Sequence, residues 1–244
     1  MTAPRSRALY AQAVEEVRMT LEHGERLLVT FVIPLAGLLL FSEVPIVSTG
    51  SQPRVQFFAP SVLALAVVST AMVNLGISTG FERGWGVLKR LGATPLGPVR
   101  LLLAKILAVL AVEVLQAAVL GGVAAGLGWR PHGPVGEAVG AAALGTVAFA
   151  GIGFLLAGTL RAEATLAVTN TLYVVFLGIS GIMFPLGQLR GFAPVARLLP
   201  AAALADLLHP ALDAGGRVPV EGWVVLAIWA LVAPSVAAAT FRFD

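Results

Sequence analysis

Charge is scarce in this sequence. Asp, Glu, Lys and Arg make up 12% of its 244 residues, whereas 58% are hydrophobic, and the mean hydropathy is +0.91. A soluble domain carries about 25% charged residues, so this chain has too few polar side chains to cover a surface in water. A lipid bilayer is the solvent that this composition suits, because apolar side chains that face lipid carry no hydration penalty.

Cysteine is absent, and histidine occurs only three times. The first absence excludes disulfides, thiol chemistry and zinc–thiolate sites, and we expect no metal site. A net charge of +3 is too small and too scattered for a nucleic-acid-binding surface. Residues 1–26 carry charges of both signs without an uninterrupted apolar core, so they do not resemble a signal peptide.

Long apolar stretches are what the sequence has instead. A membrane-spanning helix needs roughly 20 mostly apolar residues. Six stretches meet this need: Leu27–Val47, Phe57–Gly80, Leu101–Leu127, Ala138–Leu160, Ala164–Phe184 and Trp223–Phe241. The first is the weakest, because it contains Pro34 and ends near Glu43. Glycines spaced as in Gly76–Gly80 and Gly122–Gly126 favour close packing between such helices. The expected fold is an all-α integral membrane protein with six spans.

Two further segments are too polar or too interrupted to span a membrane. Residues 1–26 contain apolar side chains that recur every four positions: Leu9, Ala13, Val17 and Leu21. This pattern predicts an amphipathic helix in the membrane interface, with an ordinary solvated helix as the alternative. Residues 185–221 are broken by five prolines, and the short apolar pieces between them favour re-entrant or extracellular helices. All these segments belong to a single domain over residues 1–244.

The lysines and arginines are distributed unevenly. If six spans follow a cytoplasmic N-terminus, eleven of the sixteen basic residues, including both lysines, lie on the cytoplasmic side. Cytoplasmic loops carry such an excess. We therefore expect both termini in the cytoplasm, and Phe81–Pro98 there as well.

The segment FERGWGVLKRLGATPLGP, Phe81–Pro98, is a charged stretch between two apolar runs. Wound as a helix, Phe81–Gly92 has an apolar side formed by Phe81, Trp85 and Leu88 and a charged side formed by Glu82, Arg83, Lys89 and Arg90. The sequence predicts a short cytoplasmic helix, ended by Pro95, that rests on the membrane helices and presents its charges to the cytosol. A basic topology loop is the alternative, but it would not explain Trp85 or the ordered apolar face.

This segment resembles the one that follows the second span in ABC-2 type transporter permeases, closest to their daunorubicin-type drug-resistance branch. The matching residues are Phe81-Glu82-Arg83, Gly86, Leu88, Arg90-Leu91, Thr94-Pro95-Leu96, Pro98 and Ala104-Lys105. Val87 and Lys89 stand where Thr and Glu are common in the family. The second departure reverses a charge and puts the contact made there in doubt.

The resemblance implies a permease subunit in a bacterial cell membrane that exports a hydrophobic or amphipathic, drug-like or lipid-like substrate and confers antibiotic resistance. Its partners would be a second permease chain, identical or different, and two copies of a P-loop ATPase that bind ATP and Mg. The segment would be the helix that couples to the ATPase through Phe81, Glu82, Arg83, Trp85, Leu88, Lys89, Arg90, Thr94 and Pro95. The chain contains no G-x-x-x-x-G-K-[ST] motif, so we expect no cofactor in it and ATP hydrolysis in the partner.

Polar residues inside the expected spans form a second candidate set: Asn74, Glu113, Gln116 and Asn170. Ionisable residues at membrane depth are rare and often functional, and Glu113 and Gln116, three positions apart, share a helix face. Two interpretations stay open. Glu113 lines a substrate route and favours cationic or amphipathic cargo, or the polar residues hydrogen-bond between helices, which contributes about 0.6–2 kcal/mol per pair.

Two other classes of protein compete with the permease. A membrane-embedded enzyme would need a nucleophile, an acid pair or metal ligands in a span, yet His23, His132 and His209 lie outside the expected span cores. Ser180 lacks the spacing of a G-x-S-x-G motif. An ATP-independent secondary transporter often shows paired repeats with broken helices, which the two halves of this sequence do not.

Overall fold

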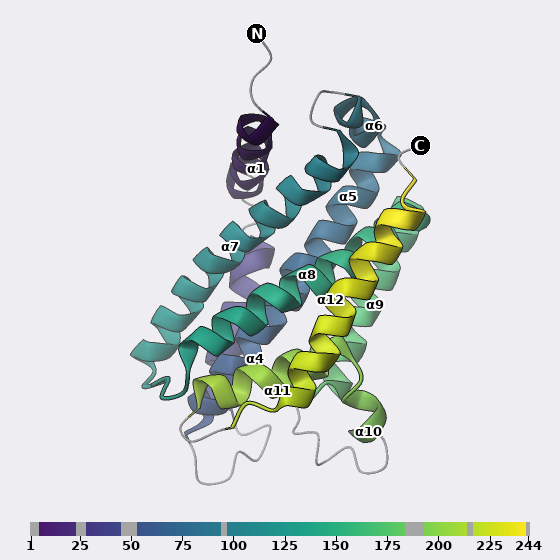
Figure 1. Ribbon diagram of the computed structural model, residues 1–244. Helices are drawn as coiled ribbons and strands as arrows, with labels where there is room; N and C mark the ends of the chain where they lie inside the picture. Colours follow the sequence, from purple (N-terminus) through teal and green to yellow (C-terminus); the bar gives the residue numbers. More distant parts are fainter. Residues whose placement is uncertain are drawn as a thin grey trace.

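The computed structural model describes residues 5–22, 28–44, 53–93, 97–183, 193–213 and 217–242, and these residues form helices joined by turns, with no strand among them (Figure 1). The elements in chain order are α1 Arg5–Glu22, the π-helical turn η1 Leu28–Val32, α3 Ile33–Glu43, α4 Arg54–Val68, the π-helical turn η2 Ser69–Asn74, α5 Leu75–Gly84, α6 Val87–Gly92, α7 Pro98–Gly126, α8 Val135–Thr159, α9 Ala162–Ile179, α10 Ala193–Ala196, α11 Pro200–Leu212 and α12 Val220–Thr240. The all-α prediction is confirmed for this part of the chain.

Five helical stretches are long and apolar enough to cross a membrane: Arg54–Gly84, Val99–Gly126, Val135–Thr159, Ala162–Ile179 and Val220–Thr240. They correspond to the second to sixth expected spans, and the chain is a multi-pass membrane protein. The first expected span is represented by the shorter apolar helix Thr30–Glu43. At 1.5 Å per residue this helix is about 21 Å long, whereas a bilayer core is about 30 Å thick. The count of six spans therefore stays a prediction.

The bundle has two distinct ends (Figure 1). The N-terminal helix α1, the short helix α6 and the C-terminus lie at one end, which we call the α6 end, and α10 and α11 lie at the other, the α11 end. Helix α11 runs across the bundle and packs on α4, α8 and α12. Its 13 residues are too few to span, and Pro200 occupies its first turn, where a missing N–H costs nothing. This agrees with short helices in residues 185–221, although residues 184–192 and 214–216 lie outside the described part.

Two glycines of α8 allow neighbouring helices to approach closely. A Cβ built on Gly151 would lie 2.5 Å from the backbone nitrogen of Pro234 in α12. A Cβ on Gly76 of α5 would lie 3.2 Å from the Cα of Gly153. Backbone therefore meets backbone at both places, and any side chain would push α12 or α5 away from α8.

The two glycine pairs singled out in the sequence have different surroundings. Besides the contact of Gly76, a Cβ on Gly80 would meet the Thr165 side chain of α9 at 3.4 Å, so close packing of the first pair is confirmed. Gly122 and Gly126 of α7 have no described atom within 4 Å of such a Cβ. For the second pair, the prediction of close packing is wrong within the described chain, because that face of α7 has no neighbouring helix.

Candidate functional site

The segment expected to form one helix over Phe81–Gly92 forms two. Residues Phe81–Gly84 end α5, and α6 begins at Val87. Gly86 between them has a φ of 69°, a left-handed conformation that is strained for residues with a Cβ. Its N–H donates to the Arg83 carbonyl at 2.9 Å and closes α5. The single-helix prediction is wrong because Gly86 ends the first helix.

Residues Gly84–Gly92 turn the chain at the tip of the bundle, and we call them the α5–α6 corner. Leu88 of α6 is fully buried and packs with Leu101 of α7, so the corner is fixed to the third long helix. Trp85, three residues before Leu88, is 69% exposed. The corner presents three exposed side chains of the expected ATPase-contact set: Trp85, Lys89 and Arg90. Two more members of that set, Thr94 and Pro95, lie outside the described residues.

Arg83 does not face outward. Its Nη1 donates to the Gly158 carbonyl at 2.7 Å, and its Nη2 donates to the Leu160 carbonyl. These carbonyls end α8, where a helix leaves acceptors unsatisfied and its dipole favours a cation. The expectation that Arg83 presents its charge to the cytosol is therefore corrected: Arg83 fastens the end of α5 to the end of α8. Phe81 is half-buried, and its ring centroid lies 5.6 Å from that of Trp85.

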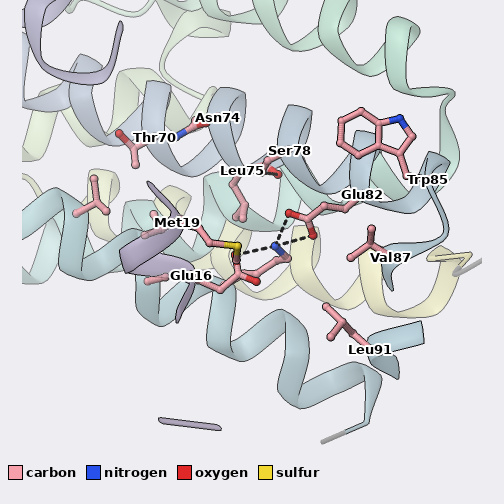
Figure 2. Close-up of a pocket in the computed structure, with 14 residues that line it drawn as sticks. Glu16, Met19, Thr70, Asn74, Leu75, Ser78, Glu82, Trp85, Val87 and Leu91 are labelled. Carbon is pink, nitrogen blue, oxygen red and sulfur yellow. Dashed lines mark hydrogen bonds and ion pairs between the residues drawn. The ribbon is translucent and has the colours of Figure 1, made fainter. Parts of the chain in front are cut away.

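Glu82 is bound inside the chain as well. The Nζ of Lys105 in α7 lies 3.0 Å from Glu82 Oε1 and 2.9 Å from Glu16 Oε2 of α1. Lys105 is only 2% exposed, so a single buried ammonium joins α1, α5 and α7. Figure 2 shows these ion pairs, with Trp85 lying away from them. We call Glu16, Glu82 and Lys105 the Lys105 cluster.

The cluster positions the N-terminal helix. Gln12 Nε2 donates to Glu16 Oε1 at 3.1 Å, so both oxygens of that carboxylate are held. Ala13 is buried, and Leu9 packs beside Leu88 and Leu101. The first part of the predicted apolar stripe, Leu9 and Ala13, thus packs against the protein itself, and the side chain of Leu21 lies outside the described part. Its placement in the membrane interface stays a prediction.

A pocket of about 300 Å³ opens beside the Lys105 cluster. Its walls come from α1, η2, α5, α6 and α7, and Figure 2 shows the residues that line it. Asn74, a member of the polar set inside the expected spans, lies on this wall together with Ser78 and Trp85. Asn74 thus shares this pocket with the Lys105 cluster, one turn after Thr70, the hydrogen-bond partner of Gln116.

Gln116 connects α7 to two other elements. Its Oε1 accepts a hydrogen bond from Thr70 Oγ1 of η2 at 2.9 Å, and its Nε2 donates to the Thr30 carbonyl of η1 at 2.7 Å. The side chain is 1% exposed. These contacts are those of an interhelical bridge. Asn170, by contrast, is exposed and donates to the Leu166 carbonyl of its own helix, so this bond joins no second helix.

Glu113 lies one turn before Gln116 and is only half satisfied. It is 9% exposed, and its Oε2 accepts a hydrogen bond from the Thr146 hydroxyl of α8. Its Oε1 is buried and has no hydrogen-bond partner among the described residues. Burying a carboxyl oxygen without a partner is costly, so this group differs from every other member of the polar set.

One polar contact was not visible in the sequence. Ser61 Oγ of α4 lies 3.2 Å from His209 Nε2 of α11, across 148 positions. Burial lowers the pKa of His209 to about 4, so the ring is neutral at pH 7. The Ser61 hydroxyl also donates to the Phe57 carbonyl at 2.9 Å and is 1% exposed. A hydroxyl enclosed in this way joins two helices and is closed to a substrate.

Comparison with known proteins places the chain. The family model described as ABC-2 family transporter protein matches residues 31–239. The chain belongs to this family. No curated protein shows significant similarity to it. The matched range contains four of the five long apolar helices, all but the last residue of the fifth, and the α5–α6 corner. As an ABC-2 permease, the chain is the membrane component of a transport system that works with an ATPase subunit, and it is not itself an enzyme.

Proposed function

We propose that this permease is one half of the membrane part of an ATP-driven exporter, and that its α5–α6 corner docks on the ATPase. The observation that carries the proposal is the exposure of Trp85, Lys89 and Arg90 on a corner whose base is fixed. An exposed tryptophan beside cations is a typical anchor of a protein interface, and two cations favour an acidic groove on the partner.

The contacts beneath the corner support a coupling role. Leu88 ties α6 to α7, Arg83 ties the end of α5 to α8, and Glu82 reaches α1 and α7 through Lys105. A displacement of the corner is therefore passed to four helices, because packed and ion-paired elements move together. On this proposal Lys89 and Arg90 contact the ATPase, whereas Glu82 and Arg83 transmit the movement.

The rest of the transporter follows from the same proposal. The α6 end faces the cytoplasm of a bacterial cell, with both termini there, and α3 with its flanking residues completes six spans. Two permease chains and two ATPase chains assemble, with ATP and Mg bound in the ATPase. The cargo is hydrophobic or amphipathic and leaves between the permeases. Helix α11, which crosses the far end of the bundle, lies at the exit.

The test is co-purification with the ATPase in mild detergent. A triple variant, Trp85→Ala with Lys89→Glu and Arg90→Glu, should lose at least ten-fold of the bound ATPase while its own melting temperature stays unchanged, because all three side chains are exposed. Arg217→Glu is the matched control, since Arg217 is an exposed arginine three residues before α12, and α12 begins at the α11 end of the bundle. Stoichiometric ATPase on the triple variant would overturn the docking assignment.

A further inference from the structure

A second pocket of about 300 Å³ lies between α4, α7, α8 and α11. It belongs to a single chain and shares no lining residue with the pocket beside the Lys105 cluster. Its wall is mostly apolar, with side chains that include Leu63, Val67, Leu110, Val139, Leu208 and Leu212. A pocket of this size is at the lower end of the range that holds small organic molecules, about 300–1,000 Å³.

Glu113 is the one ionisable residue among those that line this pocket. Its Oε1 is buried and lacks a hydrogen-bond partner among the described residues, and α4, α8 and α11 contribute no basic side chain to the wall. A carboxylate in apolar surroundings needs a proton or a cation beside it. The chain itself supplies no such cation in the described part of this pocket.

The neighbouring polar groups leave that oxygen free. Thr146 Oγ1 is within 2.9 Å of the Ala142 carbonyl and within hydrogen-bond distance of Glu113 Oε2, and its single proton serves one of them at a time. When the hydroxyl donates to Ala142, the Glu113 carboxyl must donate to the hydroxyl and is protonated. Gln116 lines the same pocket, but its amide is already bonded to Thr70 and Thr30.

Trp129 adds a second unfilled polar atom. Its ring lines the pocket, it is 6% exposed, and its indole N–H is buried without an acceptor among the described residues. An indole ring attracts cations through its face, and its N–H would donate a hydrogen bond to an oxygen atom of a ligand. The pocket thus combines an apolar wall, an incomplete carboxyl group and an aromatic ring.

We propose that this pocket binds an amine with an apolar body. The ammonium group lies against Glu113 Oε1 and completes its hydrogen bonding, while the apolar part packs on the leucines and valines of α4, α8 and α11. An amine that arrives neutral takes the proton of the Glu113 carboxyl, whereas an amine that arrives charged pairs with the carboxylate after the carboxyl proton is released to water. Both routes end in the same ammonium–carboxylate pair. The inference goes beyond the proposed function, and its test needs neither the ATPase nor a second permease.

The experiment is equilibrium binding to the full chain in phosphatidylcholine nanodiscs, with phenylbutylamine and its neutral isostere phenylbutanol as probes and empty nanodiscs subtracted. We expect saturable binding of the amine at least ten-fold tighter than of the alcohol. Glu113→Gln should remove this preference, and Ala143→Phe, an added ring at a lining position that is otherwise exposed, should weaken both probes.

Three outcomes would overturn the proposal: equal affinity for amine and alcohol, an amine preference that survives Glu113→Gln, or unchanged binding in Ala143→Phe. If Glu113→Gln does not fold, the proposal is still tested by the ratio of the amine and alcohol affinities of the native chain and by the affinities of Ala143→Phe. Nanodiscs that contain phosphatidylethanolamine separate two sources of the ammonium group. Competition with the probe assigns the pocket to an aminolipid, and unaffected probe binding assigns it to a free amine.

Discussion

Helix α7 carries two buried ionisable side chains, Lys105 and Glu113, eight residues apart and about 12 Å along the axis. The two side chains differ in how many polar partners they have. Lys105 has carboxylate partners from two other helices at 2.9 and 3.0 Å. Glu113 has a single hydroxyl partner and one oxygen with none among the described residues.

The difference indicates that Lys105 has a structural role, whereas Glu113 has a hydrogen-bonding site that the described residues leave unfilled. A buried ammonium with two carboxylates holds its helices in one arrangement, because moving any of them would leave a buried charge unpaired. The α5–α6 corner, with exposed Trp85, Lys89 and Arg90, lies at the same end of the bundle as this cluster. A buried carboxyl without its second partner adds nothing to packing, and it lies in a pocket large enough for a ligand. Helix α7 therefore holds its neighbours in place at Lys105 and lines a pocket for a ligand at Glu113.

The largest effect is expected where the paired charge is broken. Lys105→Met removes the buried ammonium that Glu16 and Glu82 share, and we expect the free energy of unfolding to fall by about 3–5 kcal/mol. Chemical denaturation in mixed micelles measures it. Lys89→Met is the matched control, because Lys89 is exposed, and it should change the stability by less than about 0.5 kcal/mol. Similar losses in both variants would contradict a structural cluster.

His209, a titratable and largely enclosed residue of α11, tests the same contrast through pH. The pKa of His209, about 4 in the folded chain, is below the ordinary value of about 6.5, so the unfolded chain binds the proton first. Neutral His209 therefore makes its full contribution to the free energy of unfolding above pH 6.5. As the pH falls towards 4, this contribution is lost, by up to about 3 kcal/mol. The difference in unfolding free energy between the native chain and His209→Gln measures it. If this difference does not change between pH 6.5 and 4, the lowered pKa of His209 is contradicted.

An intermediate effect is expected at Gln116, a neutral bridge on the same helix. Gln116→Leu leaves the Thr70 hydroxyl and the Thr30 carbonyl without their partner, and we expect a loss of about 1–2 kcal/mol. In a double-mutant cycle, Thr70→Val should cost less in the Gln116→Leu background than in the native chain. Additive losses would show that the Thr70–Gln116 bond does not contribute to stability.

Substitution of Glu113 is expected to change the free energy of unfolding least, and in the opposite direction. Glu113→Gln keeps an acceptor for Thr146 and removes a buried carboxyl with an unpartnered oxygen. The free energy of unfolding should stay unchanged or rise by about 1 kcal/mol, measured as for Lys105→Met. A loss comparable to that of Lys105→Met would mean that Glu113 is a structural residue, and the contrast between the two charges would fail.

Much of the fold could be predicted from local patterns. Apolar length located the five long helices, and small-residue spacing located the contact of Gly76. The same reasoning placed short helices before the last span, because prolines end apolar segments there. Each of these features depends on residues that are close in the sequence, which is why composition and periodicity are sufficient to predict them.

The candidate site was harder to predict, because its contacts join distant residues. Helical periodicity shows that Glu82 and Arg83 share a face, but not that the ammonium of Lys105 and the carbonyls at the end of α8 lie opposite that face. Periodicity also does not show that Glu113 has one hydrogen-bond partner whereas Gln116 has two. The break at Gly86 did have a local signal, since glycine flanks Trp85 on both sides, and a helix through that segment was the wrong choice.

Cross-linking from a single position tests the docking surface most directly. The chain contains no cysteine, so Lys89→Cys and Arg217→Cys each provide one unique thiol for a benzophenone maleimide. In the assembled transporter, illumination should link the ATPase to position 89 and leave position 217 unlinked. An ATPase that co-purifies but cross-links from position 217, or from neither position, would contradict the assignment of the α5–α6 corner.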